Sequence, residues 1–166
     1  MGYTHYWRFK GEVAPKDLKN GRDNFFKASA IIAKALHKVN EKKIKVCGGN
    51  GEGLPRISDD YISFNGCRAD DEHCETFSID INDGGFNCCK TCREPYDLLV
   101  CLSLLAFKYA FGEDFIYKSD GVTRESINDP EKIAYWRQIG WTPKVDDDWE
   151  YAYKVWDELK SELGLE

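Results

Sequence analysis

The chain has 166 residues, of which 42% are hydrophobic and 31% are charged. This length and composition fit one globular domain with a single core and exclude a chain that is disordered throughout. The formal net charge of -6 excludes broad electrostatic binding to nucleic acid, which requires a basic face.

Neither a secretory signal nor a membrane span is expected. The first ten residues, MGYTHYWRFK, lack the apolar stretch and the small-residue cleavage site of a signal peptide. The longest apolar run, residues 96–111, contains Asp97 and Lys108 and is shorter than the ~20 residues that span a bilayer. We therefore expect a cytoplasmic protein. In that reducing compartment the odd count of seven cysteines predicts free thiols and no disulfide framework.

The chain begins with a predicted strand and a predicted helix. Residues 3–9 are aromatic and β-branched, as is typical of a strand. Apolar residues at a spacing near 3.6 then predict an amphipathic helix from Pro15 to about Asn40. Because Gly21 weakens its first third, we expect the ordered helix to start nearer Asp23.

The next segments predict strands joined by loops. Residues 43–49 form a short predicted strand that runs into a flexible loop rich in glycine. This loop is not a phosphate-binding loop, because no Gly-Lys-Ser/Thr follows it. Residues 61–66 and 75–81 alternate in polarity and predict an antiparallel hairpin with an acidic connecting loop.

A second helix is predicted from Glu94 to Phe111. Thr91 and Glu94 have the spacing of a capping box, Pro95 is tolerated in a first helical turn, and Asp97 complements the helix dipole. The segment is apolar nearly all round, which predicts a buried central helix.

The last third predicts one strand and two helices. Residues 114–121 indicate a strand and a turn, residues 131–139 a short helix that stops at Gly140, and residues 146–163 an amphipathic helix. The predicted fold class is therefore α+β. We expect a mainly antiparallel sheet of about five strands, packed against the buried central helix and the amphipathic N-terminal helix, with C-terminal helices, in a single domain over residues 1–166.

Five fragments resemble, in the same order, a widespread family of small uncharacterised proteins of tailed phages and prophages. The fragments are GYTHYW at 2–7, ISFNG at 62–66, ETF at 75–77, FNCCKTCREPYDLLV at 86–100 and SDG at 119–121. The resemblance covers residues 2–121 and implies a phage origin and action in the bacterial host cell, without implying a chemical activity. Residues 122–166 look specific to this member.

The segment before the central helix suggests an anion-binding site. The family pattern maps here onto Phe86, Cys89, Lys90, Thr91, Arg93, Pro95, Tyr96 and Asp97. At a helix N-terminus, free N–H groups and the helix dipole favour a phosphate, nucleotide or carboxylate. We expect Lys90, Arg93 and Tyr96 to bind the ligand, with Thr91 as the helix cap. In the alternative interpretation, Lys90 and Arg93 pair with nearby acidic residues.

Candidates for catalysis are His5, His73, Glu75 and Asp120, because histidine and carboxylates supply both metal ligands and general bases. Their spacing does not force them together. In related sequences His often stands immediately before the Glu of the ETF fragment, whereas here Cys74 separates His73 from Glu75. This departure weakens the prediction that the chain shares a catalytic or metal-binding His-Glu pair with those sequences.

The cysteines allow a zinc set of Cys67, Cys74, Cys89 and Cys92, of which only Cys89 and Cys92 have the C-x-x-C spacing. The competing prediction of buried, inert thiols is preferred. We therefore expect no metal and no cofactor, with Cys89 and Cys92 as the candidate ligands if a metal is bound.

The C-terminal helix mixes acidic and aromatic residues, which is the composition of a partner-binding surface. The candidate partner-binding residues are Trp149, Trp156, Asp146, Asp147 and Asp148. A solvated helix face with an acidic N-terminus is the alternative interpretation.

Together these patterns favour a phage accessory protein that acts by binding, in host takeover or counter-defence. It would inhibit a host protein or sequester a small anionic or nucleotide ligand. The alternative is a small hydrolase or transferase that processes a nucleotide or metabolite, so the sequence leaves open whether the protein is an enzyme.

Overall fold

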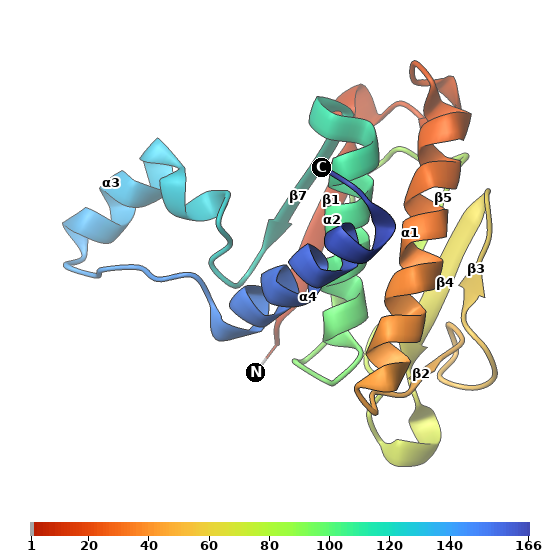
Figure 1. Ribbon diagram of the computed structural model, residues 1–166. Helices are drawn as coiled ribbons and strands as arrows, with labels where there is room; N and C mark the ends of the chain where they lie inside the picture. Colours follow the sequence, from red (N-terminus) through yellow and green to blue (C-terminus); the bar gives the residue numbers. More distant parts are fainter. Residues whose placement is uncertain (1) are drawn as a thin grey trace.

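The computed structural model describes residues 2–166 and has an α+β fold (Figure 1). Its strands are β1 (Thr4–Phe9), β2 (Val46–Cys47), β3 (Arg56–Ile57), β4 (Tyr61–Gly66), β5 (Phe77–Asp80), β6 (Asn87–Lys90) and β7 (Phe115–Ser119). Its α-helices are α1 (Gly21–Glu41), α2 (Asp97–Phe111), α3 (Pro130–Gln138) and α4 (Asp147–Leu163). The predicted fold class is confirmed.

The strands form two antiparallel sheets. The first has the order β6-β1-β7, and the second has the order β2-β4-β3, with β5 also pairing with β4. The predicted hairpin is the β4–β5 pair, in which Ile62 lies opposite Ile79. Two strands, β3 and β6, correspond to no predicted element. Within residues 2–166 no strand pairing joins the two sheets, but the rings of Trp7 and Phe77 pack 4.8 Å apart, so the sheets share one core.

Helices α1, α2 and α4 cover one side of the sheets (Figure 1). Twelve of the fifteen residues of α2 are buried, which confirms the buried central helix. The predicted capping box, however, is wrong. Helix α2 begins at Asp97, its N-cap is Tyr96, and Cys92 and Arg93 have φ angles of 55° and 60° that are incompatible with an earlier helical turn.

The N-terminal helix α1 starts at Gly21, two residues before the expected Asp23. Glycine is required there because a Cβ atom would lie 1.7 Å from the carbonyl oxygen of Pro15. Gly21 therefore permits a close approach of the preceding turn to the helix.

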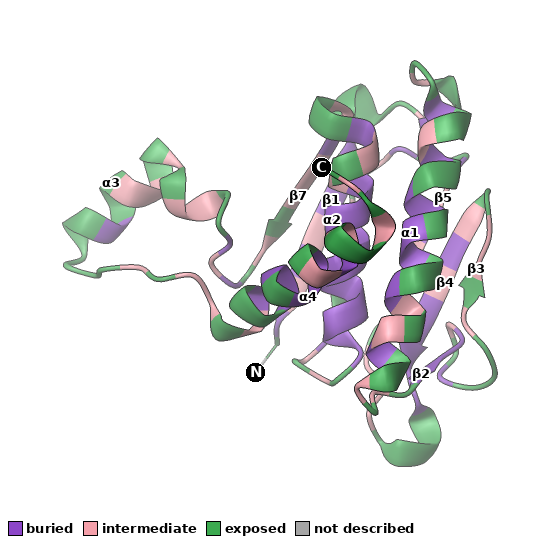
Figure 2. Cartoon of the chain, in the orientation of Figure 1, coloured by how far each residue is buried: buried purple, intermediate pink, exposed green. Residues whose placement is uncertain are grey.

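Helix α3 projects away from the rest of the molecule, on the left of Figure 1. Most of its residues are exposed or intermediate in burial (Figure 2), and it makes its main contacts with the 3-10 turn immediately before it. Helix α4 matches the predicted last helix, and its buried side faces α2. None of the helices within residues 2–166 combines the length and apolar character needed to traverse a lipid bilayer.

Candidate functional site

The four residues of the predicted anion site do not converge on a ligand. The guanidinium of Arg93 hydrogen-bonds both carboxylate oxygens of Asp146, at 3.1 and 3.3 Å, and also contacts the carboxylate of Asp148. It stacks on the ring of Tyr3, 3.9 Å from the centroid. Arg93 therefore holds the loop before α2 against the N-terminus of α4, and its charge is neutralised.

The other members of that predicted site are also engaged elsewhere. Tyr96 is buried, and its hydroxyl donates to the carbonyl oxygen of Glu75 at 2.6 Å. Burial raises the pKa of Tyr96, so its phenol stays neutral. Thr91 is buried and donates to the carboxylate of Asp97. Thr91 is therefore a core hydrogen-bonding residue, and only Lys90 is exposed and free to meet a ligand.

The predicted catalytic residues each have other partners or positions in the fold. His5 is fully buried, and His73 lies in the loop before β5. The carboxylate of Glu75 accepts the Lys90 N–H at 2.7 Å, and that of Asp120 accepts the Thr4 N–H at 3.0 Å. Within residues 2–166 no hydrogen bond or ion pair joins any two of the four candidates.

The cysteines correct the expectation that all seven are free thiols. Cys47 and Cys67 form a disulfide, because the antiparallel pairing of β2 with β4 brings their Cα atoms to 5.1 Å. The predicted zinc set is therefore incomplete. Cys89 lies in β6 with its side chain buried, and burial raises the pKa of its thiol. It does not join Cys92, whose Sγ lies 2.7 Å from that of Cys74.

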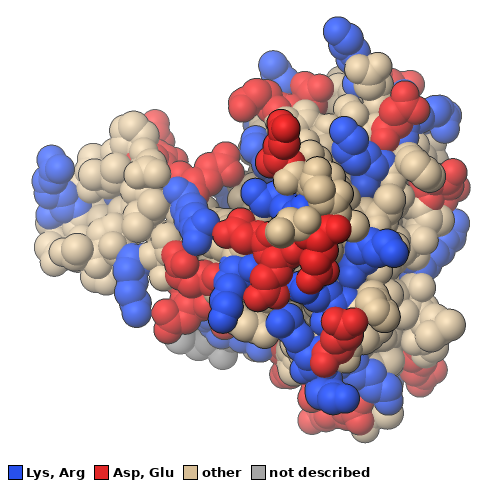
Figure 3. All heavy atoms as spheres, in the orientation of Figure 1, with Lys and Arg blue, Asp and Glu red and all other residues tan. Residues whose placement is uncertain are grey.

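The predicted partner surface on α4 is divided: its two tryptophans face inward, whereas Asp146, Asp147 and Asp148 lie at the surface. Trp149 is fully buried, with its indole N–H donating to Ser119 Oγ at 3.0 Å, and Trp156 is 7% exposed. Both point into the core because they lie on the side of α4 that packs on α2. Acidic and basic side chains intermingle over this helix-covered side (Figure 3), so it carries no surface of a single charge.

A different surface, the outer face of the first sheet, brings cations and aromatic rings together. We call it the sheet face. Alternation along β1 directs Thr4, Tyr6 and Arg8 away from the core, and the strand register places their neighbours beside them. The remaining members of the sheet face are Phe86, Cys88, Lys90, Ile116 and Lys118.

The charge of the sheet face opposes that of the whole chain. Arg8, Lys90 and Lys118 take part in no ion pair within residues 2–166, although the chain has a net charge of -6. Two carboxylates border this face. That of Asp120 accepts from Thr4 N–H and from the Tyr6 hydroxyl at 3.1 Å, and that of Glu75 accepts from Lys90 N–H at 2.7 Å. The three cations are therefore available to an anionic ligand.

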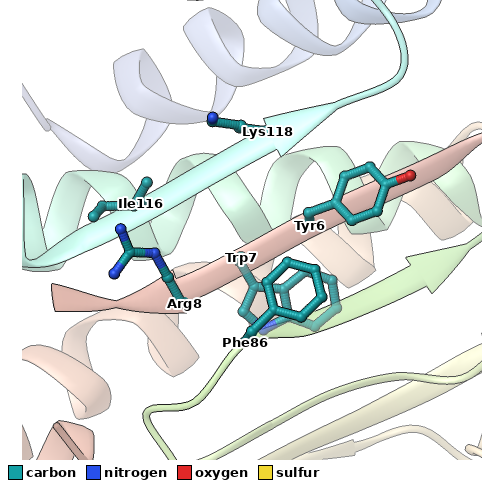
Figure 4. Close-up of a pocket in the computed structure, with 6 residues that line it drawn as sticks. All are labelled: Tyr6, Trp7, Arg8, Phe86, Ile116 and Lys118. Carbon is teal, nitrogen blue, oxygen red and sulfur yellow. The ribbon is translucent and has the colours of Figure 1, made fainter. Parts of the chain in front are cut away.

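Two aromatic rings border a shallow pocket on this face. The rings of Tyr6 and Phe86 are stacked, with centroids 6.1 Å apart and planes 25° from parallel. Phe86 is 63% exposed. Figure 4 shows Arg8 on the same strand as Tyr6, and Ile116 and Lys118 on the neighbouring strand β7, with Ile116 next to the guanidinium of Arg8. Together with Tyr6, Trp7 and Phe86 they line a pocket of about 130 Å³. A planar group can stack on the rings while an attached anion contacts the cations.

Sequence reasoning missed this face, although the strand prediction contained the signal for it. The alternation within residues 3–9 already separates Tyr6 and Arg8 from Trp7. The contribution of Phe86 and Lys118 depends on long-range pairing, which no local pattern provides.

No protein-family model, curated protein or solved structure matches the chain. The candidate site therefore stands on its own geometry.

Proposed function

We propose that the protein is a binding protein whose sheet face takes a nucleotide-type ligand, which means a planar base attached to phosphate. The single observation that supports this most is the placement of Arg8 and Lys118 beside the stacked rings of Tyr6 and Phe86. Stacking of a base on an aromatic side chain contributes about 1–3 kcal/mol. Phosphate adds a charged attraction to Arg and Lys, and this attraction weakens with salt.

Binding is favoured over catalysis because of the groups that this face offers. Its side chains supply stacking surfaces and cations, and the carboxylate of Asp120 already accepts two hydrogen bonds. The other candidates for acid-base chemistry, His5 and Glu75, lie in the core and at the backbone of β6. The alternative of a nucleotide-processing enzyme therefore has less support than sequestration of the ligand.

The resemblance to phage proteins favours a use of this binding in the bacterial host cytoplasm. Sequestration of a nucleotide removes a substrate or signal from the host, which suits host takeover or counter-defence. Because the pocket is shallow and the sheet face is small, the ligand is a mononucleotide and not a long nucleic acid.

Calorimetric titration tests the proposal with ATP, AMP and adenosine as probes. We expect affinity to fall in that order, because each step removes phosphate charge. The double substitution Arg8→Ala with Lys118→Ala should weaken ATP binding at least tenfold at low salt. Arg93→Ala, which removes a cation outside the sheet face, is the matched control and should bind ATP like the wild type. Equal loss in both variants would overturn the site assignment.

A single-stranded oligonucleotide of thymidines is the second probe. Tight binding of this strand in the absence of measurable ATP binding would contradict a mononucleotide ligand. It would replace the proposal with single-strand binding on the same face.

A second candidate function, binding to a host protein, is favoured by the arm formed by α3 and the residues that follow it. Tyr135, Ile139 and Trp141 are 59%, 56% and 46% exposed, and the main packing partner of α3 is the 3-10 turn immediately before it. Exposed aromatic residues of this kind are enriched at interface hot spots. The test substitutes all three residues by serine. A host protein that binds the purified wild type, and not this variant, in calorimetry would support the function.

A further inference from the structure

Three side chains that could hold a metal ion meet in the core, on the inner side of β1. They are His5 from β1 and Asp97 and Cys101 from α2. Asp97 and Cys101 lie four residues apart and therefore on the same face of the helix. His5 and Cys101 are fully buried, and Asp97 is 5% exposed. This group is distinct from the sheet face, because His5 alternates with Tyr6 and points to the opposite side of β1.

The ligand atoms already lie close to a metal-binding arrangement. His5 Nε2 is 2.7 Å from Asp97 Oδ1, and Cys101 Sγ is 3.6 Å from Asp97 Oδ2 and 3.9 Å from His5 Nε2. Around a tetrahedral zinc ion with ordinary bond lengths, nitrogen and oxygen ligands stand about 3.3 Å apart and sulfur stands about 3.5 Å from either. The two contacts of Asp97 use different oxygens, so a small rotation of the carboxylate and separation of His5 from Asp97 would be needed to place one oxygen, the nitrogen and the sulfur around one ion.

The second ring nitrogen of His5 takes no part in this arrangement. His5 Nδ1 is buried and has no hydrogen-bond partner within residues 2–166. A metal ion bound at Nε2 leaves Nδ1 unpaired, so the site rests on the convergence of the three ligand atoms on one side of the ring.

We propose that His5 Nε2, an Asp97 carboxylate oxygen and Cys101 Sγ bind one zinc-class divalent cation, with a water molecule as the fourth ligand. Imidazole, thiolate and carboxylate together suit Zn²⁺ or Co²⁺, whereas Mg²⁺ and Ca²⁺ prefer oxygen ligands alone. Binding replaces the thiol proton of Cys101, which is released to solvent. The two anionic ligands then balance the two charges of the ion, so the buried centre is neutral.

The position of the centre defines its role and its access route. It links the central strand β1 to the first turns of the buried helix α2, so the ion acts as a structural cross-link. Asp97 also lines a small pocket of about 140 Å³ that opens beside Arg93, Pro95 and Tyr151. Of the three ligand residues, only Asp97 lines this pocket, so we infer that the ion would enter beside Asp97. The Thr91 hydroxyl donates a hydrogen bond to Asp97 and orients its carboxylate.

The test uses the full chain, first stripped of metal with a chelator and then titrated with Co²⁺. We expect about one equivalent to bind and to give a thiolate-to-cobalt charge-transfer band together with the visible bands of a four-coordinate ion. Zn²⁺ should displace the cobalt and raise the melting temperature. Absence of a bound equivalent, or a cobalt spectrum without the thiolate band, would overturn the proposal.

Cysteine substitutions test which thiolate binds the metal ion. Cys101→Ala should abolish the charge-transfer band, whereas Cys88→Ala, which changes an exposed thiol on the sheet face, should leave it intact. If the band survives in Cys101→Ala and is lost when Cys74 and Cys92 are both replaced by alanine, the metal belongs to that pair and the assignment is wrong. X-ray absorption of the zinc-loaded wild type gives an answer even if Cys101→Ala does not fold. It should show one sulfur ligand, and a shell of two or more sulfurs would contradict the site.

Discussion

Substitution of Arg93 by alanine should lower stability and leave ligand binding intact. Its guanidinium is half exposed, and it bridges Tyr3 on one side and the carboxylates of Asp146 and Asp148 on the other. A cation stacked on a ring at such a site contributes about 0.5–1 kcal/mol, and each partly exposed ion pair contributes about 0.2–1 kcal/mol. The expected loss is therefore about 2 kcal/mol, or about 4–8 °C in melting temperature for a domain of this size.

The loss of stability caused by Arg93→Ala should depend on pH. Burial alone would raise the pKa of Asp146, but hydrogen bonds from Arg93 and from the Asp148 N–H outweigh burial and lower it below its ordinary value of 3.8. A carboxyl group with a lowered pKa in the folded chain stabilises the fold above its ordinary pKa. That contribution disappears as the pH falls through the folded pKa. The difference between wild type and Arg93→Ala should be full at neutral pH and should shrink below pH 3.8.

Urea unfolding followed by circular dichroism, at neutral and at acid pH, measures both effects. Arg8→Ala is the matched control, because Arg8 is exposed and unpaired, and its free energy of unfolding should change by less than about 0.5 kcal/mol. An Arg93→Ala variant as stable as the wild type at neutral pH would refute the structural role of this residue. A deficit that is unchanged at acid pH would refute its dependence on the carboxylates.

Three further outcomes are expected. Replacing Cys47 and Cys67 by serine should lower the free energy of unfolding by about 3 kcal/mol in urea titrations, because the disulfide closes a loop with a sequence separation of 20; equal stability would contradict a formed disulfide. Burial, and then the contact with Cys92, raises the pKa of Cys74 to about 11, so oxidation of this pair by diamide should form a second disulfide faster at alkaline than at neutral pH. Intact mass would show the loss of two hydrogen atoms, and an unchanged mass would argue against the contact. Trp149→Ala should lower the free energy of unfolding by about 3–5 kcal/mol, measured by thermal unfolding, because the ring is fully buried. A small change in that free energy would support a partner surface on α4 instead.

Local sequence patterns predicted a helix well where at least one face of that helix is buried in the core. The helix periodicity gave α1 and α4, and the apolar run gave α2, because burial on the core decides these segments. Strand β6 was missed because its sequence, Asn-Cys-Cys-Lys, has little strand character of its own. It is a strand because β1 pairs with it.

The predicted sites failed for reasons that local sequence does not contain. Lys90 and Arg93 are three residues apart, yet a pair of residues with positive φ angles turns Arg93 towards α4, where Asp146 and Asp148 neutralise it. The pairing of His5 with Asp97 spans 92 residues and depends on the docking of α2 beneath β1. Long-range packing, which sets both contacts, decides which polar residues meet.

The most direct test of the account is an NMR titration of the isotope-labelled protein with ATP, because it locates the ligand without any substitution. We expect the largest shifts in the amides of β1, β6 and β7 around Tyr6, Phe86 and Lys118, with little change in the loop that contains Arg93. Shifts that centre on residues 91–97 at the start of α2 would contradict the sheet face as the binding site.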